Sequence, residues 1–140
     1  MSYLIDTNVV SELRKGRRCD PRVSAWFRAA AGEEKFLSVL TIGEIRRGID
    51  SIKRRDERSA QKLEVWLARL RAEFAARILI VSEQIAETWG RLMVPDPLPV
   101  VDSMLAATAI VHGLTLVTRN ADDVGRTGVP LINPFEEEAG

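Results

Sequence analysis

The chain has 140 residues, 46% of them hydrophobic, which suits one globular domain with its own core and leaves no room for a second. Its 20 basic and 20 acidic side chains balance, which is a mild argument against a protein that coats nucleic acid. The single cysteine, Cys19, excludes an internal disulfide framework and a multi-cysteine metal site. No signal-peptide pattern and no bilayer-length apolar segment is present, so we expect a cytoplasmic protein that does not bind membranes.

Strand and helix patterns alternate along the first half of the chain. The apolar run Tyr3–Ile5 predicts a strand, and the polar trio Asp6-Thr7-Asn8 is suited to cap the helix that follows it. Later segments show the same alternation of short apolar runs and helical periodicity. They predict a helix over Val9–Arg14, a helix over Arg22–Ala31 ended by Gly32, a strand over Lys35–Leu40, and two helices within Thr41–Ala76 that break near Lys53–Asp56.

The second half continues the alternation. Three prolines forbid regular structure across Val94–Val101. The elements predicted around it are a strand over Arg77–Val81, a helix after Ser82, a helix over Asp102–His112 stopped by Gly113, a strand over Leu114–Thr118 and a short edge strand over Pro130–Asn133. This order predicts a single α/β domain over residues 1–140, with a parallel sheet of four to five strands and helices on both faces.

Acidic residues fall at one predicted edge of that sheet. Asp6 ends the first strand, and Glu44 lies in the first turn of the helix after the second strand. Asp102 begins the helix that leads into the fourth strand, and Asn120–Asp123 follows that strand directly. All four segments therefore converge on the carboxyl edge of the sheet, where open α/β folds bind ligands.

Such a cluster has a chemical requirement. Several carboxylates within a few ångströms cannot all ionise unless a cation compensates them. Oxygen ligands suit Mg²⁺ or Mn²⁺, and such an ion can activate a water and bind a phosphodiester oxygen. The cluster therefore predicts hydrolysis of a phosphate ester.

Each acidic position also has an ordinary structural interpretation. Asp6 suits an Asx turn, Thr41-x-x-Glu44 matches a capping box, and Asp102 suits a helix N-cap. Asp122 and Asp123 look like loop aspartates, and for them the structural interpretation is favoured. No position decides the matter alone, but the shared edge favours a site.

The amino-acid sequences of these segments, their spacing and their order resemble the four motifs of the PIN-domain family, over nearly the whole chain. Within that family the chain is most similar to the VapC toxins of bacterial type II toxin–antitoxin (VapBC) pairs, including the FitB-like branch. The segments that carry the resemblance are Tyr-Leu-Ile-Asp6-Thr-Asn8, Leu-Ser38-Val-Leu-Thr-Ile-Gly-Glu44, Val-Asp102-Ser-Met-Leu-Ala-Ala-Thr-Ala and Thr118-Arg-Asn120-Ala-Asp-Asp123.

The resemblance implies a toxin with Mg²⁺- or Mn²⁺-dependent endoribonuclease activity. Its substrate would be a structured RNA such as a tRNA or a ribosomal RNA, cut by metal-activated water. It also implies a homodimer that forms a hetero-oligomer with a VapB-like antitoxin, whose C-terminal tail occupies the acidic pocket. Operator DNA would be bound only through the antitoxin.

Carried over by residue, the resemblance makes Asp6, Glu44 and Asp102 the metal ligands and catalytic carboxylates. Asp123 is the candidate for the fourth catalytic carboxylate. Many members have an aspartate where this chain has Asn120, which would be a neutral oxygen ligand or an orienting group. This departure puts a two-metal mechanism in doubt.

Other polar residues are candidates for support or substrate binding. Thr7 and Asn8 are candidates to orient Asp6 or bind phosphate, although they also suit helix capping. Ser38 and Thr41 are candidate donors to the carboxylates. The basic candidates for contact with RNA are Arg119, for the scissile phosphate, and Arg14, Lys15, Arg46 and Arg47, for the backbone.

Two other functions compete with the nuclease. A phosphoacceptor signalling domain also gathers aspartates around Mg²⁺, but it needs a lysine after a late strand, and Thr118-Arg119-Asn120 supplies none. A non-catalytic PIN-like module that only binds an antitoxin or a nucleic acid remains an alternative, because Asn120 departs from the acidic pattern.

Overall fold

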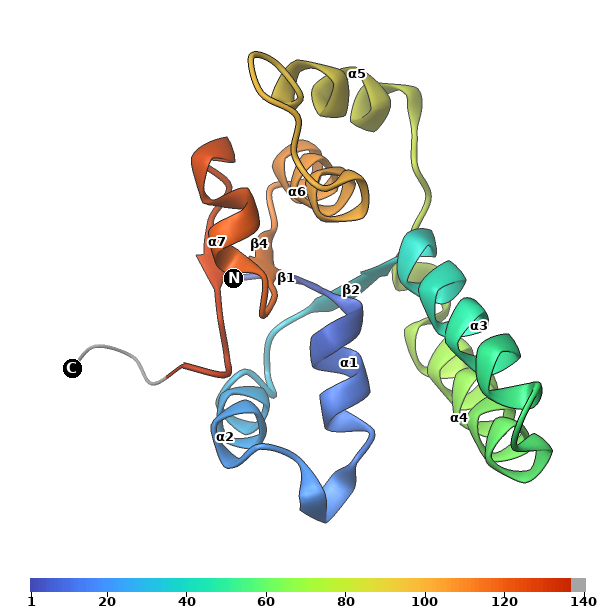
Figure 1. Ribbon diagram of the computed structural model, residues 1–140. Coiled ribbons are helices and arrows are strands. Elements are labelled where there is room, and N and C mark those ends of the chain that lie inside the picture. The colour runs from blue at the N-terminus through green and yellow to red at the C-terminus, as the bar shows by residue number, and fades with distance from the viewer. Residues whose placement is uncertain (137–140) are drawn as a thin grey trace.

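Five short strands form one parallel sheet in the order β3-β2-β1-β4-β5 in the computed structural model, which describes residues 1–136 (Figure 1). Leu4 of the central strand pairs with Phe36 on one side and with Leu116 on the other. This confirms the predicted α/β fold and the fifth, edge strand. The strands are β1 (Tyr3–Ile5), β2 (Lys35–Ser38), β3 (Ile78–Leu79), β4 (Thr115–Val117) and β5 (Leu131–Ile132).

Helices cover both faces of this sheet, so successive residues of a strand face different cores. Ile5 packs in one buried cluster with residues of α1–α4, whereas Leu4 packs in a second cluster with residues of α6 and α7 (Figure 1). The helices are α1 (Thr7–Leu13), α2 (Pro21–Ala29), α3 (Val39–Lys53), α4 (Glu57–Phe74), α5 (Glu83–Leu92), α6 (Val100–His112) and α7 (Ala121–Val124), with short 3₁₀ turns η1 (Gly16–Arg18), η2 (Ala75–Arg77) and η3 (Gly125–Thr127).

The first helix begins two residues earlier than predicted. Asp6 is its N-cap, and the side chain of Asp6 accepts a hydrogen bond from the amide of Thr7. Capping by a carboxylate satisfies an amide that would otherwise lack a partner at the helix start. The polar trio was therefore correctly interpreted as a cap, but the prediction placed the helix start at Val9, which is wrong.

The predicted capping box of Thr41 and Glu44 is also wrong. Strand β2 ends at Ser38 and not at Leu40, because the Ser38 hydroxyl accepts from the Leu40 amide and starts α3 at Val39. Thr41 is then inside the helix, and Glu44 lies in its second turn. Glu44 is therefore free to bond to another element.

Two more predictions near the acidic segments need correction. Helix α6 begins at Val100, with Pro99 as its N-cap, so Asp102 is the third helical residue and not the cap. Asp122 and Asp123 lie in the short helix α7 and not in a loop. The remaining ends differ by one or two residues, at Arg22–Ala31, Arg77–Val81, Leu114–Thr118 and Pro130–Asn133.

Within residues 1–136, no helix is both long enough and apolar enough to span a membrane. The predicted domain extends to residue 140, and residues 137–140 lie outside the described part of the chain.

Candidate functional site

The carboxylate of Asp6 is fixed at the end of β1 by three hydrogen bonds. Its Oδ1 atom accepts from the Thr7 amide at 2.6 Å. Its Oδ2 atom accepts from the Thr118 hydroxyl at 2.7 Å and from the Asn8 side-chain amide at 3.4 Å. Only 4% of Asp6 is exposed. Two of these donors belong to α1 and the third is the residue after β4. The pairing of β1 with β4 therefore brings the Thr118 hydroxyl to the Asp6 carboxylate.

Burial dominates the electrostatics of Asp6. It raises the pKa of the carboxyl to about 6, although the hydrogen bonds from Thr118 and Thr7 work in the opposite direction. The negative charges of Asp102 and Glu44 add to the increase. The charges of two carboxylates from separate segments therefore act on Asp6 at the carboxyl edge of the sheet.

Glu44 reaches the same place from the second turn of α3. Its Oε1 atom accepts a hydrogen bond of 2.6 Å from the hydroxyl of Thr7. Thr7 therefore contacts both carboxylates, with its amide on Asp6 and its hydroxyl on Glu44. The role of Thr7 in orienting Asp6 stays a prediction, and the bond of its hydroxyl to Glu44 was not predicted.

Asp102 and the residues after β4 form the other side of the site. The side-chain amide of Asn120 donates to Asp102 Oδ1 at 3.5 Å. Burial raises the pKa of Asp102, the Asn120 bond lowers it, and the charge of Asp123 raises it further. The charge of Asp123 on α7 therefore acts on Asp102. Asp123 belongs to the segment after β4 that the sequence analysis assigned to the site.

The segment after β4 is tied to α1. The Asn8 side-chain oxygen accepts from the Arg119 amide at 3.2 Å, and the Thr118 hydroxyl accepts from the Asn120 amide at 3.0 Å. Thr118 is 1% exposed and was missed as a site residue. A hydroxyl directly after a central strand, two residues before Asn120, was the signal that could have identified it.

Three predicted supporting residues do not contact the carboxylates. Ser38 caps α3, and the Thr41 hydroxyl is buried without a hydrogen-bond partner in residues 1–136. The guanidinium of Arg119 lies 4.7 Å from the ring centre of Phe135. In that same part of the chain it forms no ion pair with an acidic side chain.

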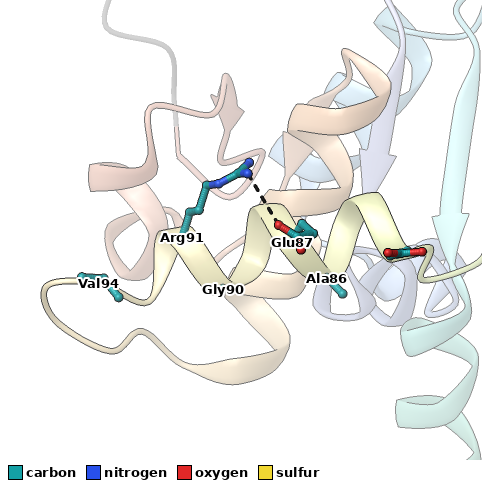
Figure 2. A pocket seen from close by; sticks show the side chains of 6 residues that line it. Ala86, Glu87, Gly90, Arg91 and Val94 are labelled. Atoms are coloured by element: carbon teal, nitrogen blue, oxygen red, sulfur yellow. Dashed lines mark ion pairs between the residues drawn. The ribbon is translucent and has the colours of Figure 1, made fainter.

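No three His, Cys, Asp or Glu side chains within residues 1–136 are gathered closely enough to hold a metal ion as they stand. Joint ligation by Asp6, Glu44 and Asp102 therefore stays a prediction. A hollow of about 750 Å³ lies elsewhere, along α5, where Arg91 pairs with Glu87 at 3.5 Å (Figure 2). None of the predicted site residues lines that hollow.

Comparison with known proteins agrees with this fold. Residues 3–128 match the PIN domain profile. The chain is 30% identical over 142 residues to the VapC ribonuclease Y4jK of Sinorhizobium fredii, covering 95% of this chain and 97% of that protein. It is 29% identical over 141 residues to the toxin FitB of Neisseria gonorrhoeae, covering 96% and 99%. The solved structure of FitAB bound to an IR36 DNA fragment superposes with a TM-score of 0.72 at 28% identity, covering 97% of each chain. The chain therefore belongs to the PIN-domain family.

Proposed function

We propose that the chain is the toxin of a VapBC-type pair and that it is an endoribonuclease dependent on Mg²⁺ or Mn²⁺. The observation that carries the proposal is the buried Asp6 carboxyl, on which Asp102 and Glu44 act electrostatically at the carboxyl edge of the sheet. One relative, the VapC ribonuclease Y4jK, is named for RNA cleavage, and another, FitB, is named a toxin.

The donors at this edge fit a hard divalent cation. Asp6, Glu44 and Asp102 offer carboxylate oxygens, and none of the three forms an ion pair within residues 1–136. Their mutual repulsion is therefore not compensated by the chain itself, and carboxylate oxygens are what Mg²⁺ and Mn²⁺ prefer. Bound there, the ion supplies the Lewis acidity that phosphodiester hydrolysis needs at neutral pH.

Other residues orient the carboxylates or add negative charge beside them. Thr118, Thr7 and Asn8 hold Asp6 in one orientation, so this ligand needs no rearrangement before it binds. Asn120 orients Asp102 through its side-chain amide. Asp123 adds negative charge beside Asp102, which strengthens the attraction for a cation and fits its predicted place as the fourth carboxylate.

The proposed partners follow from the relatives. FitB is a toxin, and its complex with FitA was solved on a DNA fragment. These relatives support an antitoxin partner for this chain. From the resemblance of its motifs we further propose that the C-terminal tail of the antitoxin occupies the acidic pocket, that operator DNA is bound through the antitoxin, and that the toxin is a homodimer. The proposed substrate is a structured RNA, a tRNA or a ribosomal RNA.

The test is cleavage of total cellular RNA by the purified chain with Mg²⁺, Mn²⁺ or EDTA. We expect discrete fragments that require metal and that are lost in both Asp6→Asn and Asp102→Asn. The matched control is Asp122→Asn, an exposed aspartate beside Asp123 on α7, which should cut like the unchanged chain. Asp123→Asn should lose part of the activity because its charge acts on Asp102.

One outcome would replace this proposal with the non-catalytic alternative. A folded, antitoxin-free chain that binds RNA but leaves it intact under all metal conditions is a binding module. Cleavage that survives in Asp6→Asn and Asp102→Asn would place the active site elsewhere.

A further inference from the structure

We propose that the exposed face of α3 binds the sugar–phosphate backbone of the RNA beside the cleavage point; this inference rests on the function proposed above. That face begins at Glu44 and continues at helical spacing to the turn before α4. We name it the α3 stripe, and its members, all exposed, are Glu44, Arg47, Gly48, Ser51, Arg54 and Arg55.

The α3 stripe is continuous with the acidic site. Thr7 bonds to Glu44, the first residue of the stripe. A hollow of about 190 Å³ lies between α1 and the α3–α4 pair, and Thr7, Glu44, Gly48 and Arg14 are among its lining residues. A Cβ atom added at Gly48 would meet nothing within 4 Å, so the surface beside Glu44 is open to an approaching strand.

The arginines of the stripe are free to bind phosphate. Within residues 1–136, the guanidinium groups of Arg47, Arg54 and Arg55 form no ion pair and no hydrogen bond. Arg46, on the same helix, is different, because it pairs with Glu64 and, at 3.6 Å, with Asp50. Arg46 was predicted as an RNA contact together with Arg47, and because its guanidinium is already paired we do not count it in the proposed surface.

The turn at the far end of the stripe keeps a positive excess. Residues 53–58 contain four cations and two carboxylates, giving a net charge of +2. One of the carboxylates, Asp56, is the N-cap of α4 and accepts from the amide and hydroxyl of Ser59. Its charge is therefore directed at the start of α4 and does not pair with Arg54 or Arg55.

The chemistry and length of the stripe fit a polyanion. Guanidinium groups bind phosphate oxygens with two parallel donors, whatever the base sequence. At about 1.5 Å of rise per residue, Arg54 lies roughly 15 Å along the helix axis from Glu44. The stripe therefore reaches phosphates away from the scissile one, which favours long or structured RNA over a dinucleotide.

The test measures binding separately from cleavage. Fluorescently labelled bulk tRNA is titrated with the Asp102→Asn chain, in which cleavage is blocked, at several KCl concentrations. The variants on this background are Arg47→Glu and the pair Arg54→Gln/Arg55→Gln, each of which changes the net charge by −2. The matched control is Arg28→Glu, also −2, on α2, which lies on the other side of α1 (Figure 1).

We expect both stripe variants to bind tRNA at least about tenfold more weakly. The slope of log K against log salt should fall by roughly 0.7–0.9 for each phosphate that the variant no longer neutralises. Arg28→Glu should stay within about twofold of the parent, which would show that position matters beyond net charge. Circular dichroism and thermal unfolding of each variant check that the fold is retained.

Equal weakening in all three variants, no weakening in any, or no tRNA binding by the parent would each overturn the inference. These results are distinct from failure of the nuclease proposal. A chain that cuts RNA while its stripe variants bind normally refutes the stripe alone. A chain that never cuts RNA but binds it through the stripe refutes the nuclease alone.

Discussion

The acidic site has two halves that are held very differently. The Asp6 carboxylate is buried and accepts three hydrogen bonds, from the helix start that it caps and from the end of β4. Glu44 is exposed and accepts one bond, from Thr7, and Asp102 accepts one long bond, from Asn120. The Asp6 half is a fixed anchor, whereas the half that contains Glu44 and Asp102 is open.

This difference shows at which carboxylate ionisation is most unfavourable in the folded protein. Burial of the Asp6 carboxylate disfavours its ionised form, and the charges of Asp102 and Glu44 add to this, so the pKa of Asp6 is raised to about 6. Burial also ensures that Asp6 is already oriented. The open half costs less stability, but its geometry depends on single contacts that a substitution can remove.

The largest expected effect concerns the anchor and pH. Because the pKa of Asp6 rises from 3.8 to about 6 on folding, the folded state holds this proton more tightly than the unfolded state. The contribution of Asp6 to stability is therefore present at pH 3 and is lost as pH rises through 4 to 6. The loss amounts to about 3 kcal/mol at most, at about 1.36 kcal/mol per pH unit.

The measurement is urea unfolding of the unchanged chain and of Asp6→Asn between pH 3 and pH 8, with EDTA. Subtracting the two curves removes the contributions of carboxylates that do not act on Asp6, such as Asp20 and Asp56, whose pKa values are lowered by their own hydrogen bonds. A difference that stays flat from pH 4 to 6 would show that Asp6 ionises like an exposed carboxyl.

The next effect removes one donor from the anchor. Thr118→Val keeps the shape of the side chain but removes the shortest hydrogen bond to Asp6 Oδ2, together with the oxygen that accepts from the Asn120 amide. We expect a loss of about 1–3 kcal/mol in stability and of about 10–100-fold in cleavage rate. The control is Thr108→Val on α6, a buried threonine whose hydroxyl, among residues 1–136, bonds only to the Met104 carbonyl of its own helix.

If Thr118→Val and Thr108→Val cost the same activity, Thr118 serves packing and not the orientation of Asp6. Mn²⁺ binding, followed by thermal unfolding, gives a second readout. A role in positioning predicts weaker binding for Thr118→Val only.

A smaller effect is expected in the open half. Thr7→Val removes the hydroxyl bonded to Glu44 but keeps the amide bonded to Asp6. Because Glu44 is exposed, stability should change by less than about 1 kcal/mol, while cleavage falls by up to about tenfold. Thr7→Ser keeps the hydroxyl and should restore the rate. A Thr7→Ser chain as slow as Thr7→Val would show that the hydroxyl is not the group that matters.

Sequence patterns predicted the sheet and the shared edge because both follow from alternation and chain direction. Each strand was found within a few residues, and the charges of Asp102 and Glu44 do act on Asp6. Helix starts were less predictable, because several polar residues compete for each cap. Ser38, and not Thr41, caps α3, and Asp6, and not Asn8, caps α1.

The supporting contacts were the least predictable part of the site. The bond from Thr118 to Asp6 joins residues 112 positions apart, and it exists only because β4 lies beside β1. The bond from Thr7 to Glu44 depends on α3 starting at Val39 and not at Thr41. Such contacts form only at the assembled edge, so a local pattern can mark Thr118 as a candidate but does not identify Asp6 as its partner.

The smallest effect is expected at Asn120, where many PIN-domain proteins carry aspartate. Asn120→Asp replaces the donor to Asp102 with a like charge, so without metal it should raise the pKa of Asp102 further. With metal, the added carboxylate should strengthen Mn²⁺ binding severalfold. That gain would appear as a larger Mn²⁺-induced rise in the unfolding midpoint, because ligand binding to the folded state stabilises it in proportion to log affinity. Asn120→Ala is the control, since it removes the donor without adding charge. If Asn120→Asp instead binds Mn²⁺ as weakly as Asn120→Ala, then the important group of Asn120 is the side-chain amide that donates to Asp102. The open half of the site would then be organised by hydrogen bonding and not by a fourth carboxylate.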